Sequence, residues 1–259
     1  MINFEVLFLG TGNAVNSACK ANQAVLFKLG SKNILIDCGP TTLYCFKKHN
    51  IDPNNIDSIL FTHYHGDHFI GSIFLDLAFV IEYFRKKSII YGAGQGLYDH
   101  FYKSYQICFE DFFPNNSFPR IFQEYCTDKI YELYEGIKIY TFKMSHRKES
   151  LGYRIEFDNK VVAITGDTKW NDNIIKLSNN ADLLIVECSF YEKPLKEMPH
   201  ISYEELAYRA KLLNVSNVVL IHADKTLLSK RSRLKFQIMD DGMKIDIRHR
   251  SEIIYHFCG

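Results

Sequence analysis

Three histidines and one aspartate lie within the six residues of segment 63–68, which reads His-Tyr-His-Gly-Asp-His. Imidazole nitrogens and carboxylate oxygens are ligands that Zn²⁺ and similar divalent ions prefer. On an extended backbone His63 and His65 point to the same side and can share one ion, whereas Asp67 and His68 follow a turn at Gly66 and can reach a second. The spacing therefore predicts metal ligands rather than a polar surface loop.

Further side chains of the same kind follow apolar segments elsewhere in the chain. They are Asp37, His146, Asp167, Glu187 and His222. The segments before them read as buried strands, and in a layered fold the ends of such strands meet at one edge, where sites form. Residues far apart in the sequence are therefore expected to complete the site that segment 63–68 begins.

The hydrophobic pattern predicts an α/β protein in two halves of similar size. Strands are expected over 4–9, 23–29, 32–36, 58–62, 88–91, 121–125, 129–134, 137–144, 151–157, 160–164, 183–186, 218–221, 243–247 and 252–257. Helices are expected over 41–49, 70–83, 97–107 and 171–177, and from Ser202, where Glu205 completes a capping box. Segment 10–12 reads Gly-Thr-Gly and predicts a turn at the rim of the site.

Composition narrows the class of protein. The 259 residues are 47% hydrophobic and contain no linker or repeat, so one domain spanning residues 1–259 is expected. A net charge of +1 gives no basic field for nucleic acid or an anionic membrane. The seven cysteines form no Cys-x-x-Cys pair, which is typical of a reducing compartment. With no signal peptide or membrane-spanning run, a cytoplasmic protein without membrane contact is expected.

These ligands in this order resemble the metallo-β-lactamase superfamily. Segment 63–68 matches its His-x-His-x-Asp-His motif, His146 its third histidine, Asp167 its bridging aspartate and His222 its final histidine. The resemblance covers essentially the whole chain. It implies a four-layer αβ/βα sandwich, in which two mixed sheets are flanked by helices.

Within the superfamily the chain is most similar to ribonuclease Z and its phosphodiesterase relatives. The similarity lies in segments 10–12, 37–39, 151–155 and 181–190. In addition, His200 lies two residues before the helix cap Ser202 and matches an extra histidine of those enzymes.

The resemblance also implies roles for the matched residues. His63, His65 and His146 would hold one divalent ion, and Asp67, His68 and His222 would hold a second, with Asp167 bridging both. Zinc is the expected metal, with manganese or iron as alternatives. Such a pair of ions generates hydroxide near neutral pH, which would attack a phosphodiester.

Four residues are expected to assist the chemistry. His200, oriented by Glu187, would stabilise the scissile phosphate and protonate the leaving oxygen. Asp67 is assigned to the catalytic set as well as to the ligands. Asp37 is expected to orient a ligand from outside the coordination shell.

One difference from bacterial ribonuclease Z narrows the range of expected substrates. Bacterial ribonuclease Z carries a tRNA-binding arm between the third-histidine segment and the bridging aspartate, whereas residues 155–165 here predict only a hairpin. We therefore expect a phosphodiesterase acting on a small, cyclic or nucleotide phosphodiester. The alternatives are a tRNA 3′-processing endoribonuclease with RNA as its partner, a thioester or lactone hydrolase on the same metals, and a non-hydrolytic accessory protein. Family members often dimerise, so the analogy also suggests a homodimer.

Overall fold

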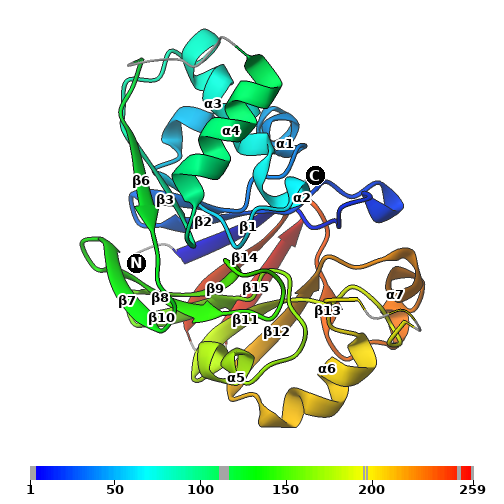
Figure 1. The fold of residues 1–259 in the computed structure, drawn as a ribbon. Helices are drawn as coiled ribbons and strands as arrows, with labels where there is room; N and C mark the ends of the chain where they lie inside the picture. Colours follow the sequence, from blue (N-terminus) through cyan, green and yellow to red (C-terminus); the bar gives the residue numbers. More distant parts are fainter. Residues whose placement is uncertain (1–3, 111–116, 195, 197, 250–251, 258–259) are drawn as a thin grey trace.

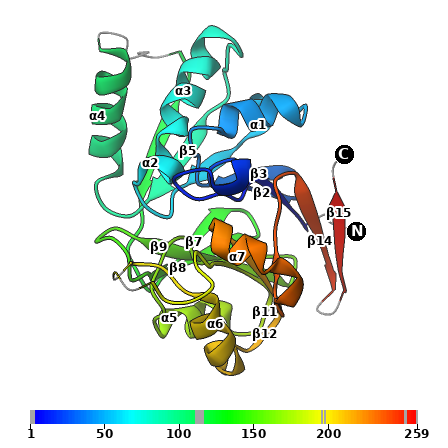
Figure 2. The ribbon, with the colours of Figure 1, turned by 90° about the vertical axis from the view of Figure 1, so that its right-hand side faces the viewer.

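Two mixed β-sheets pack face to face and carry helices on their outer faces (Figure 1). The computed structural model describes residues 4–110, 117–194, 196, 198–249 and 252–257. Figure 2 shows the layers edge-on, with helices above the first sheet and below the second. The predicted four-layer α/β sandwich is confirmed. No helix in the described part of the chain is long and apolar enough to cross a membrane.

The first sheet has eight strands, and their spatial order places the two C-terminal strands beside the N-terminal one. In that order they are β15 (Glu252–Phe257), β14 (Met243–His249), β1 (Phe4–Gly10), β2 (Ala24–Leu29), β3 (Lys32–Ile36), β4 (Ser58–Leu60), β5 (Ile89–Ala93) and β6 (Arg120–Glu124). Strands β3 to β6 run parallel to one another.

The second sheet has seven strands and mixes hairpins with parallel pairs. In spatial order they are β13 (Gln237–Ile238), β12 (Val215–Ile221), β11 (Ala181–Glu187), β10 (Lys160–Ile164), β9 (Leu151–Phe157), β8 (Ile137–Lys143) and β7 (Lys129–Tyr134). Strands β10 to β13 run parallel. Both sheets therefore contain a block of parallel strands, and the carboxyl ends of the strands in each block lie at the same edge of the sheet.

The helices divide between the two outer faces (Figure 2). Helices α1 (Thr42–Lys48), α3 (Gly71–Ile81) and α4 (Leu97–Phe109) cover the first sheet, and α5 (Asn173–Ser178) and α6 (Tyr203–Arg209) cover the second. Two short helices, α2 (Gly66–Phe69) and α7 (Lys225–Ser229), follow β4 and β12. Single 3₁₀ turns occur at Ser17–Cys19, Pro53–Asn55, Ala210–Leu212 and Arg231–Arg233.

Alternation along the strands fills three apolar layers. In β1, Phe4, Val6 and Phe8 point between the sheets, whereas Leu7 and Leu9 face the helices of the first half. In β11 the two sets alternate in the same way, with one set between the sheets and the other against α5 and α6. Because both faces of these strands are buried, their sequences are continuously apolar.

Every strand and helix range predicted from the sequence has a counterpart in the structure. The turn predicted at Gly66 is wrong, because Gly66 is the first residue of α2 and its carbonyl accepts a hydrogen bond from the N–H of Ile70 (3.1 Å). The hairpin predicted over 155–165 is confirmed, since only Asp158 and Asn159 join β9 to β10. Both have positive φ angles (51° and 57°), as a tight two-residue turn requires.

Candidate metal centre

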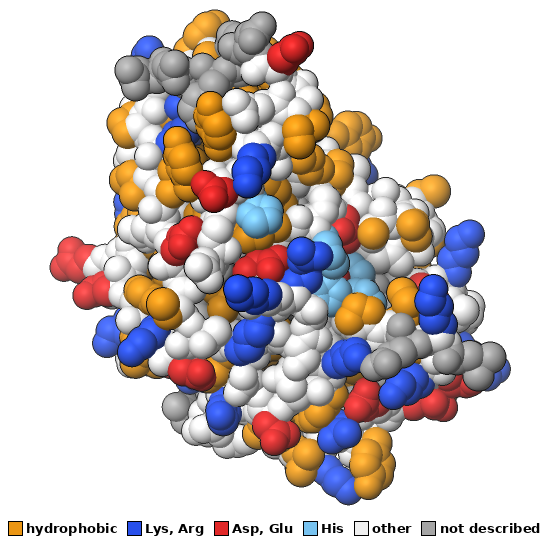
Figure 3. Space-filling view, viewed as in Figure 1, with side chains coloured by type: hydrophobic (Ala, Val, Ile, Leu, Met, Phe, Trp, Pro, Cys, Tyr) orange, Lys and Arg blue, Asp and Glu red, His pale blue; other side chains and the backbone are white. Residues whose placement is uncertain are grey.

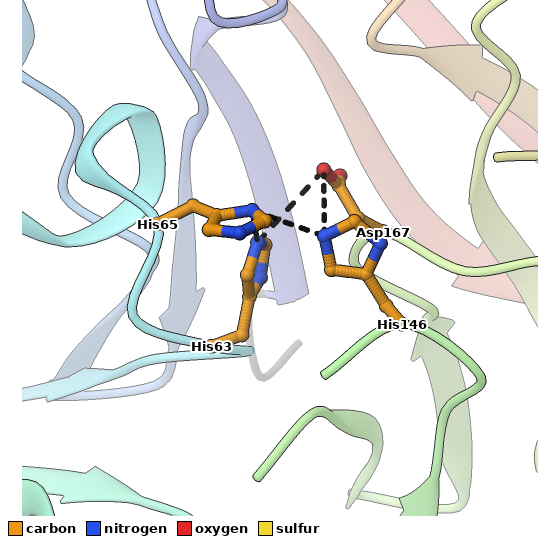
Figure 4. Close-up of side chains that lie close together, drawn as sticks. All are labelled: His63, His65, His146 and Asp167. Carbon is orange, nitrogen blue, oxygen red and sulfur yellow. Dashed lines mark hydrogen bonds and ion pairs between the residues drawn. The ribbon is translucent and has the colours of Figure 1, made fainter. Parts of the chain in front are cut away.

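Four predicted ligands converge on one point at the seam between the two sheets. Nδ1 of His65 lies 3.0 Å from Nε2 of His63 and 3.0 Å from Nε2 of His146. Oδ2 of Asp167 lies 3.9 Å from Nε2 of His63 and 3.9 Å from Nε2 of His146. Figure 4 shows the three rings and the carboxylate facing one another. Three imidazoles and one carboxylate at such distances form a suitable donor set for a divalent ion.

A second group shares Asp167 with the first. Nε2 of His68 lies 3.3 Å from Oδ2 of Asp67 and 3.3 Å from Oδ1 of Asp167. Nε2 of His222 lies 3.5 Å from Oδ2 of Asp67 and 3.4 Å from Oδ2 of Asp167. The structure thus brings all seven predicted ligands together in two groups that have one carboxylate in common.

The fold explains why these residues meet. His63 and His65 follow β4 of the first sheet, and α2 carries the next two ligands, Asp67 and His68. The other three follow strands of the second sheet: His146 follows β8, Asp167 follows β10 and His222 follows β12. The candidate ligands therefore come from both halves of the sandwich.

Two buried nitrogens test whether the residues fit a metal ion. Nε2 of His68 and Nε2 of His222 are buried and have no hydrogen-bond partner. Buried polar atoms in this state are rare in folded proteins, and a bound ion would satisfy both. Burial also lowers the pKa of His63 well below its usual value and that of His146 to about 4. Neutral imidazoles keep a lone pair for coordination, so these two rings suit a divalent metal. Burial would also lower the pKa of His68, but Asp167 and Asp37 outweigh burial and raise that pKa, so binding of an ion at His68 would release a proton.

In four of the histidines Nδ1 contacts a hydrogen-bond partner outside the ligand cluster, which leaves Nε2 facing the centre. The partners of Nδ1 are Thr62 Oγ1 for His63 (3.0 Å), Asp37 Oδ2 for His68 (2.7 Å), Pro199 O for His146 (3.1 Å) and Ser189 Oγ for His222 (2.9 Å). Asp37 is fully buried and also accepts hydrogen bonds from the backbone N–H of Thr62 (2.7 Å) and from its hydroxyl (2.9 Å). Contacts of this kind fix ring orientation and tautomer.

Glu187 and His200 also meet at the site. Oε1 of Glu187 lies 3.0 Å from Nδ1 of His200 and accepts hydrogen bonds from the N–H groups of Thr168 (3.0 Å) and Ile201 (3.2 Å). The same Nδ1 lies 3.9 Å from Oδ2 of Asp167. Burial alone would lower the pKa of His200, but the hydrogen bond and charge of Glu187 outweigh burial and raise it to about 9. Glu187 therefore favours the protonated form of His200, beside the shared carboxylate.

Two site residues were missed in the sequence. The hydroxyl of Ser189 donates to Oε2 of Glu187 (3.1 Å) and lies 2.9 Å from Nδ1 of His222, so it connects both parts of the site. Nη1 of Arg147 lies 3.4 Å from the outward Nε2 of His65. Its position directly after His146 was the available signal. Figure 3 shows histidine side chains at the surface with lysine and arginine side chains beside them.

His222 depends on a contact with the start of the chain. Its φ angle is +66°, a left-handed conformation that is unusual for a residue with a side chain, and its N–H donates to the carbonyl of Thr11 (2.8 Å). Asp241 holds Thr11 by accepting from its N–H (2.9 Å) and its hydroxyl (2.8 Å). The glycine at position 10 is required here, because a Cβ would lie 1.9 Å from the carbonyl oxygen of Asn22.

Replacing Asp241 by alanine is expected to weaken metal binding by about 10- to 100-fold, since His222 would lose the support of its backbone. Competition with a chelating dye would measure this. The exposed carboxylate of Asp172 offers a control, and Asp172→Ala should leave metal affinity unchanged. Equal affinity of the two variants for metal would mean that the Thr11 contact does not position His222.

Comparison with known proteins adds to this geometry. The family model described as "Anti-Pycsar protein Apyc1" matches residues 4–239. Ribonuclease Z of Azobacteroides pseudotrichonymphae is 25% identical in an alignment that covers 91% of this chain and 95% of that protein. Ribonuclease Z of Pyrococcus furiosus is 26% identical, with 84% of this chain and 85% of that protein covered.

Solved structures show the same architecture. The human short-form tRNase Z (ELAC1) superposes with a TM-score of 0.74 at 26% identity, covering 95% of this chain and 100% of that one. The metallo-β-lactamase fold protein YhfI from Bacillus subtilis gives a TM-score of 0.76 at 22% identity, covering 94% and 99%. These matches confirm the predicted resemblance to ribonuclease Z-like members of the metallo-β-lactamase superfamily.

Proposed function

The chain belongs to the Apyc1 family of anti-Pycsar proteins, and on that premise we propose that it is a metal-dependent phosphodiesterase acting on a small, cyclic or nucleotide phosphodiester. The observation that carries the proposal is the contact between the seven-ligand cluster and the Glu187–His200 pair, through Asp167. A ligand cluster alone suits many hydrolases. A protonated histidine beside it suits the departure of an alkoxide from phosphorus.

We assign the ligands to two divalent ions, with zinc first and manganese or iron as alternatives. His63, His65 and His146 would hold one ion, Asp67, His68 and His222 would hold the other, and Asp167 would contact both. Two such ions polarise phosphoryl oxygens and activate a water molecule near neutral pH.

The chain's own groups would move the protons. Nδ1 of His200 is engaged by Glu187, so Nε2–H of the protonated ring would be the donor to the leaving oxygen. Burial would raise the pKa of Asp67, but His222 and His68 outweigh it and hold that pKa below the usual range. The ionised carboxylate of Asp67 would therefore both bind metal and accept a hydrogen bond from the attacking water.

Arg147 would place a positive charge beside the proposed metal ions. Its Nε donates to Oε1 of Glu149 (3.0 Å), which leaves the guanidinium at the mouth of the site beside His65. If Nδ1 of His65 coordinates an ion, its Nε2 carries a proton and repels the N–H groups of Arg147. The guanidinium would then turn toward a phosphoryl oxygen, which it suits geometrically.

Hydrolysis of bis(p-nitrophenyl) phosphate tests the proposal. The protein loaded with zinc or manganese is expected to release p-nitrophenolate, and treatment with a chelator should stop the reaction until metal is restored. Metal analysis of the same sample would show whether ions are bound. A fully metal-loaded protein that leaves the diester intact would contradict the proposed function.

A second candidate function is tRNA 3′ processing, because curated relatives named ribonuclease Z match 91% and 84% of this chain. The two-residue connection between β9 and β10 argues against it, since the tRNA-binding arm of the bacterial enzymes is expected there. Cleavage of a precursor tRNA at its 3′ end would favour it. Activity on a thioester or lactone that does not depend on His200 would instead favour carbonyl hydrolysis. Sedimentation would test the homodimer that the family analogy suggests.

A further inference from the structure

A third group of donor atoms lies directly beside the two ligand groups of the metal centre. It consists of Glu187, His200 and His222, and one donor atom of each lies within 4.8 Å of the other two. Oε1 of Glu187 and Nδ1 of His200 are 3.0 Å apart, the same separation as between the donor nitrogens of His63 and His65 in the first group. Two imidazoles and one glutamate occur together as the protein ligands of single zinc ions.

The two imidazoles of this third group present their nitrogens on the same side. The rings of His200 and His222 stack, with centroids 5.2 Å apart and an angle of 23° between their planes. Nδ1 of His200 and Nε2 of His222 lie 3.9 Å and 3.4 Å from the same oxygen, Oδ2 of Asp167. Bonds of about 2.0–2.2 Å place two tetrahedral zinc ligands roughly 3.3–3.6 Å apart, so small side-chain movements would suffice to enclose an ion.

The carboxylate of Glu187 is positioned independently of His200. Glu187 is fully buried, and its Oε1 accepts hydrogen bonds from the N–H groups of Thr168 (3.0 Å) and Ile201 (3.2 Å). Its Oε2 accepts a hydrogen bond from the hydroxyl of Ser189 (3.1 Å). These donors keep the carboxylate in place when the proton between it and His200 is exchanged for a metal ion, which makes Glu187 a preorganised anionic ligand.

His222 is the member that the third group shares with the second. Its Nδ1 lies 2.9 Å from Oγ of Ser189, and its Nε2 is buried without a hydrogen-bond partner. The ring therefore has one free nitrogen, whereas the carboxylate of Asp167 has two oxygens and can contact two ions. Because one nitrogen coordinates one ion at a time, an ion in the third group would take His222 away from the second.

We propose that Glu187, His200 and His222 form an alternative position for the second divalent ion, with zinc as the expected metal. The inference rests on the proposed function, which assigns that ion to the second ligand group. An ion in the alternative position replaces the proton that Nδ1 of His200 shares with Glu187. The ring is then neutral and a poor proton donor, so the chain with its ion in this position is an inactive form.

A double-mutant cycle on zinc affinity tests this inference. Asp67→Ala removes a ligand of the second group alone, so the second ion is expected to move to the alternative position and to bind less than about tenfold more weakly. His200→Ala should leave the affinity unchanged, because the second group is intact. The double variant has neither position complete, and we expect it to bind the second ion at least about tenfold more weakly than the two single effects predict. Equilibrium dialysis against buffered zinc, with zinc measured per chain, gives these constants.

Two further double variants control the result. Glu187→Gln keeps the shape of the side chain and removes its charge, so in the Asp67→Ala background it should give the same loss as His200→Ala. His100→Ala removes an exposed imidazole of α4, whose Nδ1 lies 2.8 Å from the carbonyl oxygen of Gly96, and in that background it should change nothing. Additive effects of both His200→Ala and Glu187→Gln, or loss of the second ion in Asp67→Ala alone, would overturn the inference. A third zinc ion that binds to the wild type but not to His200→Ala would also overturn it, because the two positions would then be filled together.

Failure of the inference and failure of the proposed function have different signatures. If the metal-loaded wild type hydrolyses bis(p-nitrophenyl) phosphate and the cycle is additive, the alternative position is wrong and the phosphodiesterase assignment stands. If the diester is not hydrolysed, the proposed function fails, whereas a non-additive cycle would still establish the alternative position as a zinc site.

Discussion

Asp167→Asn is expected to lower kcat/KM for phosphodiester hydrolysis by more than about 100-fold, beyond the range for residues that only support a metal ligand. Asp167 is the one carboxylate that belongs to both ligand groups, and it is only 3% exposed. Burial would raise its pKa, but His222 and His68 outweigh burial and hold the pKa well below its usual value. Asparagine has a similar shape but no charge, so both ion sites would lose an anionic ligand together.

Metal analysis separates this effect from a loss of folding. The Asp167→Asn protein is expected to retain fewer ions per chain after dialysis than the wild type. Asp182 is a suitable matched control, because it is buried (2% exposed) on β11 and accepts a hydrogen bond from the N–H of Val161 (2.7 Å), outside the ligand groups. Asp182→Asn should keep its full metal content. Wild-type activity and metal content in Asp167→Asn would contradict the bridging assignment.

His200→Ala is expected to lower kcat by about 10²- to 10⁴-fold for a diester whose leaving group is an alkoxide, while metal content stays unchanged. An alkoxide needs a proton as it departs, and the protonated ring of His200 would supply it. The p-nitrophenolate anion is stable without a proton, so the same variant should lose far less activity on bis(p-nitrophenyl) phosphate. Equal losses on the two substrates would contradict the role of His200 as a proton donor.

The pH dependence of the alkoxide reaction gives a second readout of the same residue. Because Glu187 raises the pKa of His200 to about 9, the donor form predominates below that pH and is lost above it. For the wild type, kcat should therefore fall as the pH rises through about 9. Glu187→Gln removes the charge that raises this pKa, so the fall should begin at lower pH. In His200→Ala this fall of kcat with rising pH should be absent.

The sequence was most informative where a local pattern coincided with a chemical requirement. Segment 63–68 contains four candidate ligands within six consecutive residues, and each later candidate follows an apolar strand. Because the parallel strands of both sheets end at the same seam, residues at those ends had to meet. The strand ranges and the ligand types predicted that these side chains would meet, and the resemblance to the metallo-β-lactamase superfamily supplied the assignment of individual ligands.

Other features have no local signal. The hydrogen bonds of Asp241 to Thr11 join residues 230 positions apart. The left-handed backbone of Asp37 (φ 60°) and His222 (φ 66°), which few residues other than glycine adopt, is held by tertiary contacts. The start of α2 at Gly66 was missed because a glycine between two ligands usually indicates a turn.

The distribution of ligands over the seam has a thermodynamic consequence. His63, His65, Asp67 and His68 belong to the first half of the sandwich, and His146, Asp167 and His222 belong to the second. An ion bound by residues of both halves would add a link to the apolar packing and the hydrogen bonds that already join them. Binding that requires the assembled seam favours the native state by mass action, by about 2.7 kcal/mol for each site when free metal is at 100 times its dissociation constant. The supply of free metal would then set both the rate of turnover and the margin by which the chain resists unfolding.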